Sequence, residues 1–206
     1  MLKKDIRAFF KAIRRQDCAF IVSQLDAIPE LLTARSVGAP KADDGQSSLQ
    51  VALKVRAFEI VEHLVACGAD VNFRETSQVN EWTAPVLHDA IRALGWTSHT
   101  MDRTQQQFER AFRVFRLLLS KGADPNGTDS YGNTCFCRAG LDARTFILHP
   151  AADLESGIVV AQFRRIVAAL VTAGGDLNAR GQRGTVVREA FEEKGLGQFR
   201  LLADIP

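Results

Sequence analysis

The sequence of 206 residues contains no long apolar run and little net charge. Its start, MLKKDIRAFFKAIRRQDCAFIV, lacks the unbroken apolar stretch of a signal peptide, and no segment approaches a membrane span. The formal net charge is only +2, so no strong field favours nucleic acid or an anionic membrane. These absences predict a soluble, cytoplasmic protein with no nucleic-acid or membrane partner.

Cysteine and histidine, with four residues each, are too scattered to form a familiar site. Cys135 and Cys137 form Cys-x-Cys, which is not the spacing of redox or zinc sites, so we expect reduced thiols that pack. No glycine-rich phosphate loop, nucleophile elbow or paired-carboxylate motif is present. The sequence therefore predicts a non-catalytic protein without a cofactor or metal. The alternative, a metal-dependent enzyme, would need His99 and His149 adjacent around a bound metal.

One short segment occurs in three variants, CGADVN, KGADPN and AGGDLN, whose glycines are Gly68, Gly122 and Gly174. Apolar residues three and four apart precede these glycines, as in FEIVEHLVACGADVN (58–72) and FRVFRLLLSKGADPN (112–126). This spacing, ended by glycine, predicts an amphipathic helix with a glycine C-terminal stop. The Asp and Asn that follow favour a tight turn leading into a hairpin.

A second pattern lies upstream of each of these helices. The segments DGQSSLQVAL (44–53), TAPVLHDAI (83–91) and GNTCFCRAG (132–140) are each similar to G-x-T-P-L-H-x-A. The whole unit resembles the ankyrin repeat, a turn plus two antiparallel helices of about 33 residues. The resemblance implies an all-α fold, an ankyrin-repeat solenoid of stacked helix-turn-helix units with β-hairpin or turn fingers. It also implies that His88, at the motif histidine position, forms structural hydrogen bonds to neighbouring turns.

The repeat register extends to both ends of the chain and divides a single ankyrin-repeat domain, 1–206, into five units. Atypical terminal units suit a solenoid, because an end repeat has one face against water. The expected units are an N-terminal capping repeat (5–42), a repeat (43–76), two repeats with inter-helix insertions (77–127 and 128–179) and a C-terminal capping repeat (180–206).

The first predicted helix is basic. Ile6, Phe9, Phe10 and Ile13 form one apolar stripe, and lysines and arginines surround it. Such a helix could dock on acidic lipid or nucleic acid. The interpretation we favour is the solvated outer face of a capping helix.

Extra residues fall between the two helices of adjacent repeats. Compared with the first full repeat, the second has 16 more residues before its glycine and the third has 19 more. Thr104 with Gln107 predicts a capping box and Pro150 predicts a helix start, so part of each insertion should lengthen the outer helix. The remaining segments, 94–103 and 141–149, should project side by side opposite the hairpin tips. There they either pack on each other or form a recognition surface.

Ankyrin-repeat proteins are, as a family, protein-binding scaffolds. The resemblance therefore implies a chain that binds another protein through its concave face, hairpin tips and inserted loops. We expect the chain to be monomeric by itself. An immunity or inhibitor protein that neutralises a toxin or enzyme, and an effector that binds a host protein, are alternative forms of this function. Residues carried over from the family's recognition positions are Asp43, Asp44, Gln46, Lys54, Glu81, Trp82, Arg92, Ser130, Tyr131, Asn133 and Asp142, with Arg180 and Gln182 in the last unit.

The inserted segments add Trp96, His99 and Phe146 to the expected partner-binding residues. Trp82 and Tyr131 occupy equivalent positions in adjacent tips, where exposed aromatic residues are typical interface anchors. The competing interpretation is that each aromatic ring packs on the next finger.

Overall fold

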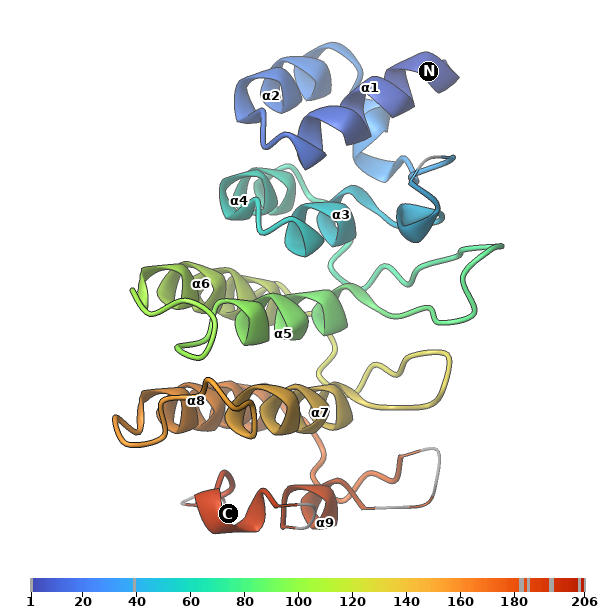
Figure 1. Ribbon diagram of the computed structural model, residues 1–206. Helices are drawn as coiled ribbons and strands as arrows, with labels where there is room; N and C mark the ends of the chain where they lie inside the picture. The colour runs from blue at the N-terminus through green and yellow to red at the C-terminus, as the bar shows by residue number, and fades with distance from the viewer. Residues whose placement is uncertain are drawn as a thin grey trace.

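The computed structural model describes residues 2–38, 40–181, 184, 186–192, 195–203 and 205. Within these residues the fold is all-α, with nine α-helices, three short 3-10 helices and no β-strand. Figure 1 shows the helices as a stack of antiparallel pairs, with loops projecting from one side of the stack. The predicted all-α class is therefore confirmed.

Each pair consists of an inner helix, on the side of the projecting loops, and an outer helix behind it. The pairs are α1 (Lys3–Arg14) with α2 (Cys18–Ala27), α3 (Ser48–Lys54) with α4 (Phe58–Ala66), α5 (Val86–Trp96) with α6 (Gln106–Ser120), and α7 (Cys135–Ile147) with α8 (Ile158–Thr172). The last unit contains α9 (Val187–Glu192) and the 3-10 helix Gly197–Phe199, and the other 3-10 helices are Pro29–Thr33 and Lys41–Asp43. Inner helix α5 packs on both α3 and α7, so the stack is continuous.

One core runs through the whole stack and is rich in phenylalanine. Buried rings from consecutive units, among them Phe9, Phe115 and Phe163, belong to the same hydrophobic cluster. The apolar stripe predicted for the first helix faces this core, since Phe10 and Ile13 are buried and Ile6 is half-buried. Burial of this stripe leaves the basic residues of α1 as its solvated side, apart from Arg14, whose Nε donates to Asp43 Oδ2 at 2.7 Å.

The repeated turns are joined to one another by their asparagines. Asn72 donates its amide to the carbonyl of Gly122 at 2.8 Å and accepts from the backbone N–H of Asp124 at 2.8 Å. Asn126 makes the same two bonds to the following turn, at 3.1 and 2.8 Å. Gly122 has φ +85°, a left-handed conformation that glycine adopts without strain. The recurring Gly and Asn are therefore explained by helix termination and by a clamp between successive units.

A second link between units involves the residue at the motif histidine position. Nε2 of His88 lies 3.1 Å from the carbonyl oxygen of Gly127 in the next unit. In the preceding unit Gln50 holds the equivalent position, and its Nε2 donates to the carbonyl of Ala84 at 2.9 Å. Burial lowers the pKa of His88 to about 4, so its ring is neutral at physiological pH. The structural role implied for His88 agrees with this contact.

The projecting loops, which we call fingers, are not the expected β-hairpins. Each is closed by one isolated antiparallel bridge, and the bridging pairs are Arg35 with Ser47, Arg74 with Pro85, Thr128 with Thr134, and Arg180 with Val186. Some finger backbone groups bond within their own finger, as Glu75 N–H does to Ala84 at 3.0 Å, and others bond between fingers. Thr76 N–H donates to Gly45 at 3.1 Å, and Ser130 N–H donates to Thr83 at 2.8 Å. The fingers thus brace one another, and no strand forms in the described residues.

The insertions lengthen both helices of their pairs. Helices α6 and α8 have 15 residues each where α4 has 9, as predicted for the outer helices. The inner helices also grow, because residues 94–96 end α5 and residues 141–147 continue α7. The inserted residues continue the apolar period of the inner helices, as the burial of Leu94 and Ile147 shows.

Two details of the predicted insertions are wrong. The N-cap of α6 is Gln105 without a side-chain cap, and Thr104 Oγ1 donates to Asp102 at 2.7 Å instead of forming a capping box. Pro150 does not start a helix, since α8 begins at Ile158. The chain between α7 and α8 is a connection stabilised by turns. In one of them Ser156 donates its backbone N–H to Asp153 Oδ1 and its hydroxyl to the Asp153 carbonyl, at 3.1 and 3.2 Å.

Candidate functional site

A groove of about 640 Å³ lies between the fingers and the inner helices α3 and α5. We call it the finger groove. Its lining combines aromatic side chains (Trp82, Trp96 and Tyr131) with buried polar side chains (Gln46, Glu75 and Asp89). Its position follows from the fold, because each inner helix directly follows a finger and therefore forms the wall behind it.

The aromatic residues are held at the groove by specific contacts. The indole Nε1 of Trp82 donates to Asp129 Oδ2 at 2.9 Å, and the guanidinium of Arg92 lies over the Trp82 ring at 5.9 Å. Tyr131 remains 42% exposed and Trp96 remains 47% exposed. Trp82 is half-buried, so part of its ring packs on the next finger, as the competing interpretation expected. The finger tips that carry Trp82 and Tyr131 both still expose aromatic surface.

Asp129 organises the finger that carries Tyr131. Its carboxylate accepts hydrogen bonds from the backbone amides of Tyr131 and Asn133, both at 2.9 Å, and from the side chain of Asn133. Burial alone would raise the pKa of Asp129, but the bonds from Asn133 and Trp82 outweigh it and the pKa is lowered. Asp129 therefore stays charged and fixes the positions of Trp82 and Tyr131 together.

Two buried carboxylates line the groove without a cationic partner among the described residues. Glu75 accepts from Gln46 Nε2 at 3.2 Å and Asn80 Nδ2 at 3.5 Å, and Asp89 accepts from Gln50 Nε2 at 3.2 Å. Burial raises the pKa of Glu75, although these amides partly offset the effect, and raises the pKa of Asp89 to about 7. Buried acids with such shifts are characteristic of functional sites.

The nearby cations are engaged elsewhere or lie at the rim. Lys54 donates to Asp43 Oδ1 at 2.9 Å and to the carbonyl of Ala42 at 2.6 Å. Asp43 is buried between Lys54 and Arg14, so this predicted partner-binding residue acts as an internal ion-pair centre. Exposed Arg92 is a rim cation that lies close to Trp82.

Several other predicted residues brace the fingers. Asp44 accepts from Ser77 Oγ at 3.1 Å, and Ser130 Oγ donates to the carbonyl of exposed Glu81 at 3.0 Å. Arg180 donates to the carbonyl of Gly184 within its own finger, at 2.9 Å. Gln182 lies outside the described residues.

The residues predicted in the insertions pack inward, except Trp96. Phe146 is buried, with its ring centroid 5.4 Å from Trp96, and buried His99 donates its backbone N–H to Gln162 Oε1 at 2.8 Å. Thr100 Oγ1 donates to the carbonyl of Phe146 at 2.9 Å. Asp142 is also buried and pairs with Arg138 on its own helix. The first insertion thus packs on α7 and α8 of the next unit instead of projecting from the stack.

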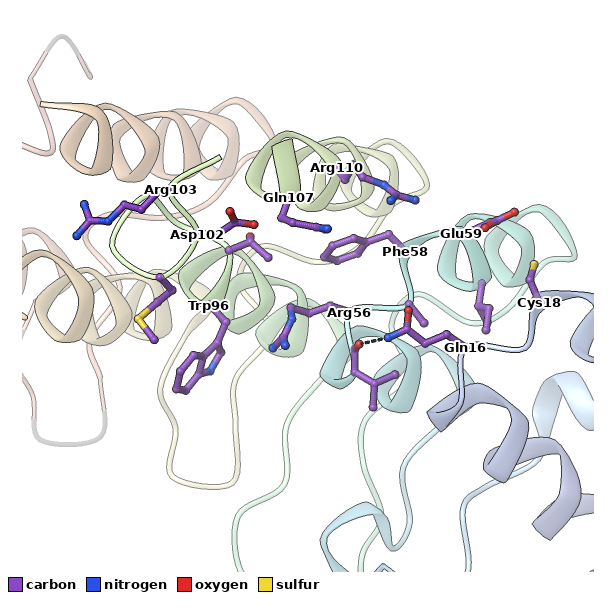
Figure 2. A pocket seen from close by; sticks show the side chains of 15 residues that line it. Gln16, Cys18, Arg56, Phe58, Glu59, Trp96, Asp102, Arg103, Gln107 and Arg110 are labelled. Atoms are coloured by element: carbon purple, nitrogen blue, oxygen red, sulfur yellow. Dashed lines mark hydrogen bonds between the residues drawn. The ribbon is translucent and has the colours of Figure 1, made fainter. Parts of the chain in front are cut away.

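A second hollow, of about 620 Å³, lies at the step between the short α3–α4 pair and the longer α5–α6 pair. The six additional residues of α6 extend it by about 9 Å at 1.5 Å per residue. Figure 2 shows Gln107 of α6 and Phe58 of α4 at this hollow, with Arg103 turned away from it. Arg56 and Trp96 line both this hollow and the finger groove, so the two hollows adjoin at these side chains.

Sequence reasoning placed Trp82, Tyr131 and Trp96 at the site but missed Glu75 and Asp89. Asp89 directly follows the motif histidine, His88. An acidic residue beside this expected buried position could have indicated a buried carboxylate. Glu75 carried no such signal, because its burial arises from the fold of the finger around Gln46 and Asn80.

The described residues contain no group of three His, Cys, Asp or Glu side chains that could hold a metal ion. His99 Nε2 lies 3.5 Å from Asp153, and His149 Nδ1 accepts from the backbone N–H of Ala151 at 3.0 Å. No helix within the described ranges is long and apolar enough to cross a membrane. Neither a protein-family model nor a curated protein matches the chain at a significant level.

Proposed function

We propose that the chain is a non-catalytic ankyrin-repeat scaffold that binds another protein in the finger groove. The observation that carries this proposal is the aromatic lining, in which Trp82, Trp96 and Tyr131 share one groove and two of them are more than two-fifths exposed. Large exposed aromatic rings beside an arginine are the side chains most enriched at energetic centres of protein interfaces.

The ankyrin assignment is supported by the links between units. The asparagine clamps of Asn72 and Asn126 and the equivalent contacts of Gln50 and His88 recur at the same place in successive units. Such nearest-neighbour contacts are what a stacked repeat needs, because each unit buries its faces only against its neighbours.

The arrangement of the fingers also favours a binding surface. Hydrogen bonds between fingers, such as those of Ser130 to Thr83 and Glu81, fix their relative positions before any partner arrives. A rigid surface loses less conformational entropy on binding, and more of the contact energy therefore contributes to affinity. We place the protein in the cytoplasm, because its four cysteines are free thiols.

Photocrosslinking in native lysate tests this proposal and identifies the partner in the same step. Tyr131→benzoylphenylalanine places a photoreactive group at the groove, and Leu154→benzoylphenylalanine places it at a loop residue that is 44% exposed and does not line the groove. We expect one protein in the lysate to crosslink at position 131 and not at 154. Equal crosslinking at both positions, or at 154 alone, would reject the finger groove as the binding site.

The identity of the crosslinked protein separates the possible forms of the function. A toxin or enzyme whose activity falls on binding would make the chain an inhibitor or immunity protein. A protein of another organism would make it an effector. A partner whose activity is unchanged by binding would make it an adaptor.

A further inference from the structure

The finger groove contains negative charge that the described part of the protein leaves unpaired. Glu75 is 4% exposed and Asp89 is 7% exposed, and the described residues form no ion pair with either. Their side-chain hydrogen-bond donors are amides from Gln46, Asn80 and Gln50. A buried carboxylate ordinarily needs a cation or several donors to offset its lost hydration.

A third acceptor in the same lining is also unsatisfied. Gln46 is 3% exposed, its Nε2 is used by Glu75, and its Oε1 has no hydrogen-bond partner among the described residues. These three buried side chains therefore present acceptor oxygens that only neutral amides meet in the described residues, and one of these oxygens has no donor at all. Unsatisfied buried polar groups are rare in folded proteins, and one that lines an open groove is a position where a ligand can supply the missing bond.

We propose that Asp89, Glu75 and Gln46 form a subsite for one basic side chain of the partner protein, with arginine the best fit. This inference rests on the proposed function and specifies the chemistry of the partner. A guanidinium group offers five N–H donors in a planar fork, which suits two carboxylates and an amide oxygen better than the point charge of lysine does. The aromatic rings of Trp82 and Tyr131 on the same groove provide faces on which a guanidinium can stack.

The cations around the groove do not occupy this subsite. Lys54 is bound by Asp43, and Arg92 lies over the Trp82 ring. Arg56 also lines the groove, is exposed, and forms no ion pair with Asp89 or Glu75 in the described part of the chain. On the neighbouring helix α7, Arg138 pairs with Asp142. Lys54 and Arg92 lower the pKa of Asp89 by less than burial raises it, so the carboxyl group is still partly protonated near neutral pH. A bound guanidinium needs the ionised form, and its affinity should be about tenfold lower at pH 6 than at pH 8.

The probe is N-acetyl-argininamide, with the citrulline analogue as a neutral compound of the same shape. Binding is followed by the indole N–H resonance of Trp82, and since the chain has two tryptophans, Trp96→Phe assigns it. We expect a saturable shift with the arginine compound and none with the citrulline compound at equal ionic strength. Asp89→Asn with Glu75→Gln should weaken binding by at least about tenfold, because two charge-assisted hydrogen bonds are lost.

The control is Asp26→Asn, which neutralises an exposed carboxylate of α2 that does not line the groove. Its affinity for the arginine compound should equal that of the wild type. If the double variant does not fold, Asp89→Asn alone should still weaken binding severalfold. Equal shifts with arginine and citrulline, no saturable shift, or unchanged affinity in the folded variant would each overturn the subsite.

The arginine titration uses no partner protein and the crosslink is read at position 131, so the two proposals can fail separately. Crosslinking without arginine binding would remove the subsite and keep the protein-binding groove. Arginine binding without crosslinking would keep the subsite and remove the proposed protein partner.

Discussion

Replacing Asp89 with asparagine should change how the stability of this protein depends on pH. The carboxyl group ionises near pH 3.8 in the unfolded chain, whereas burial in the folded chain raises its pKa to about 7. Between these values the folded state binds more protons than the unfolded state, so the stability contributed by this group falls as pH rises. A shift of about three units corresponds to a cost of about 4 kcal/mol above pH 7.

The neighbouring His88 opposes this trend over part of the range. Its pKa falls from 6.5 to about 4 on folding, so its contribution is fully present above pH 6.5 and is lost as pH decreases toward 4. The two slopes nearly cancel in the wild type between about pH 4 and pH 6.5. The informative quantity is therefore the difference in unfolding free energy between wild type and Asp89→Asn at the same pH, because His88 contributes equally to both.

Urea denaturation from about pH 5 to pH 8 measures this difference. As pH rises from 5, we expect the unfolding free energy of Asp89→Asn to increase relative to that of the wild type by about 1.4 kcal/mol per pH unit, and the difference should level off above pH 7. Asp26→Asn, at an exposed residue of α2, controls for the loss of one negative charge. A difference that stays constant within about 0.5 kcal/mol over this range would refute the buried, uncompensated state of Asp89.

Three further changes test the packing of the stack. Asn126→Ala removes two hydrogen bonds between units and should lower the unfolding free energy, measured by urea denaturation, by about 1–3 kcal/mol. Asn178 is the corresponding residue of the last turn and its side chain has no hydrogen-bond partner among the described residues, so Asn178→Ala should cost less than about 0.5 kcal/mol. Equal losses in the two variants would contradict the clamp. Gly45→Ala should lower the unfolding free energy by more than about 2 kcal/mol, because the new Cβ would lie 2.3 Å from the backbone nitrogen of Ser77. Gly68 is also left-handed but lies in open space, so Gly68→Ala should lower it by only about 1 kcal/mol, as measured by thermal unfolding. His88→Ala should cost about 2–4 kcal/mol by urea denaturation, since it leaves a cavity and removes the contact to the next unit, and a loss under about 0.5 kcal/mol would refute that role.

The stacked helix pairs were predictable because their signals are local. Apolar spacing before Gly68 and Gly122 sets the end of an outer helix, and the asparagine after each glycine makes the same bonds in successive turns. The sequence could not show that α5 and α7 are lengthened as well. Their extra residues are buried by packing against each other and against the first insertion, as Phe146 and Thr100 show.

The exposed part of the site was predictable and its buried part was not. Trp82 and Tyr131 follow from their position in the finger register. The environment of Glu75 depends on Gln46, which is 29 residues away, and that of Asp89 depends on Gln50, which is 39 residues away. Such pairings arise only when neighbouring units stack, and the sequence spacing alone does not identify them. The bracing between fingers has the same origin, because backbone bonds such as Thr76 to Gly45 and Ser130 to Thr83 join adjacent fingers.

The affinity of the crosslinked partner for three forms of the protein tests the central claim most directly. The forms are the wild type, Trp82→Ala with Tyr131→Ala, and Leu154→Ala, which truncates an equally exposed apolar residue away from the groove. Calorimetry should show at least about a hundredfold loss of affinity in the double variant and no change in Leu154→Ala, since two anchor side chains are removed only from the former. Equal affinity of all three folded proteins would contradict binding in the finger groove.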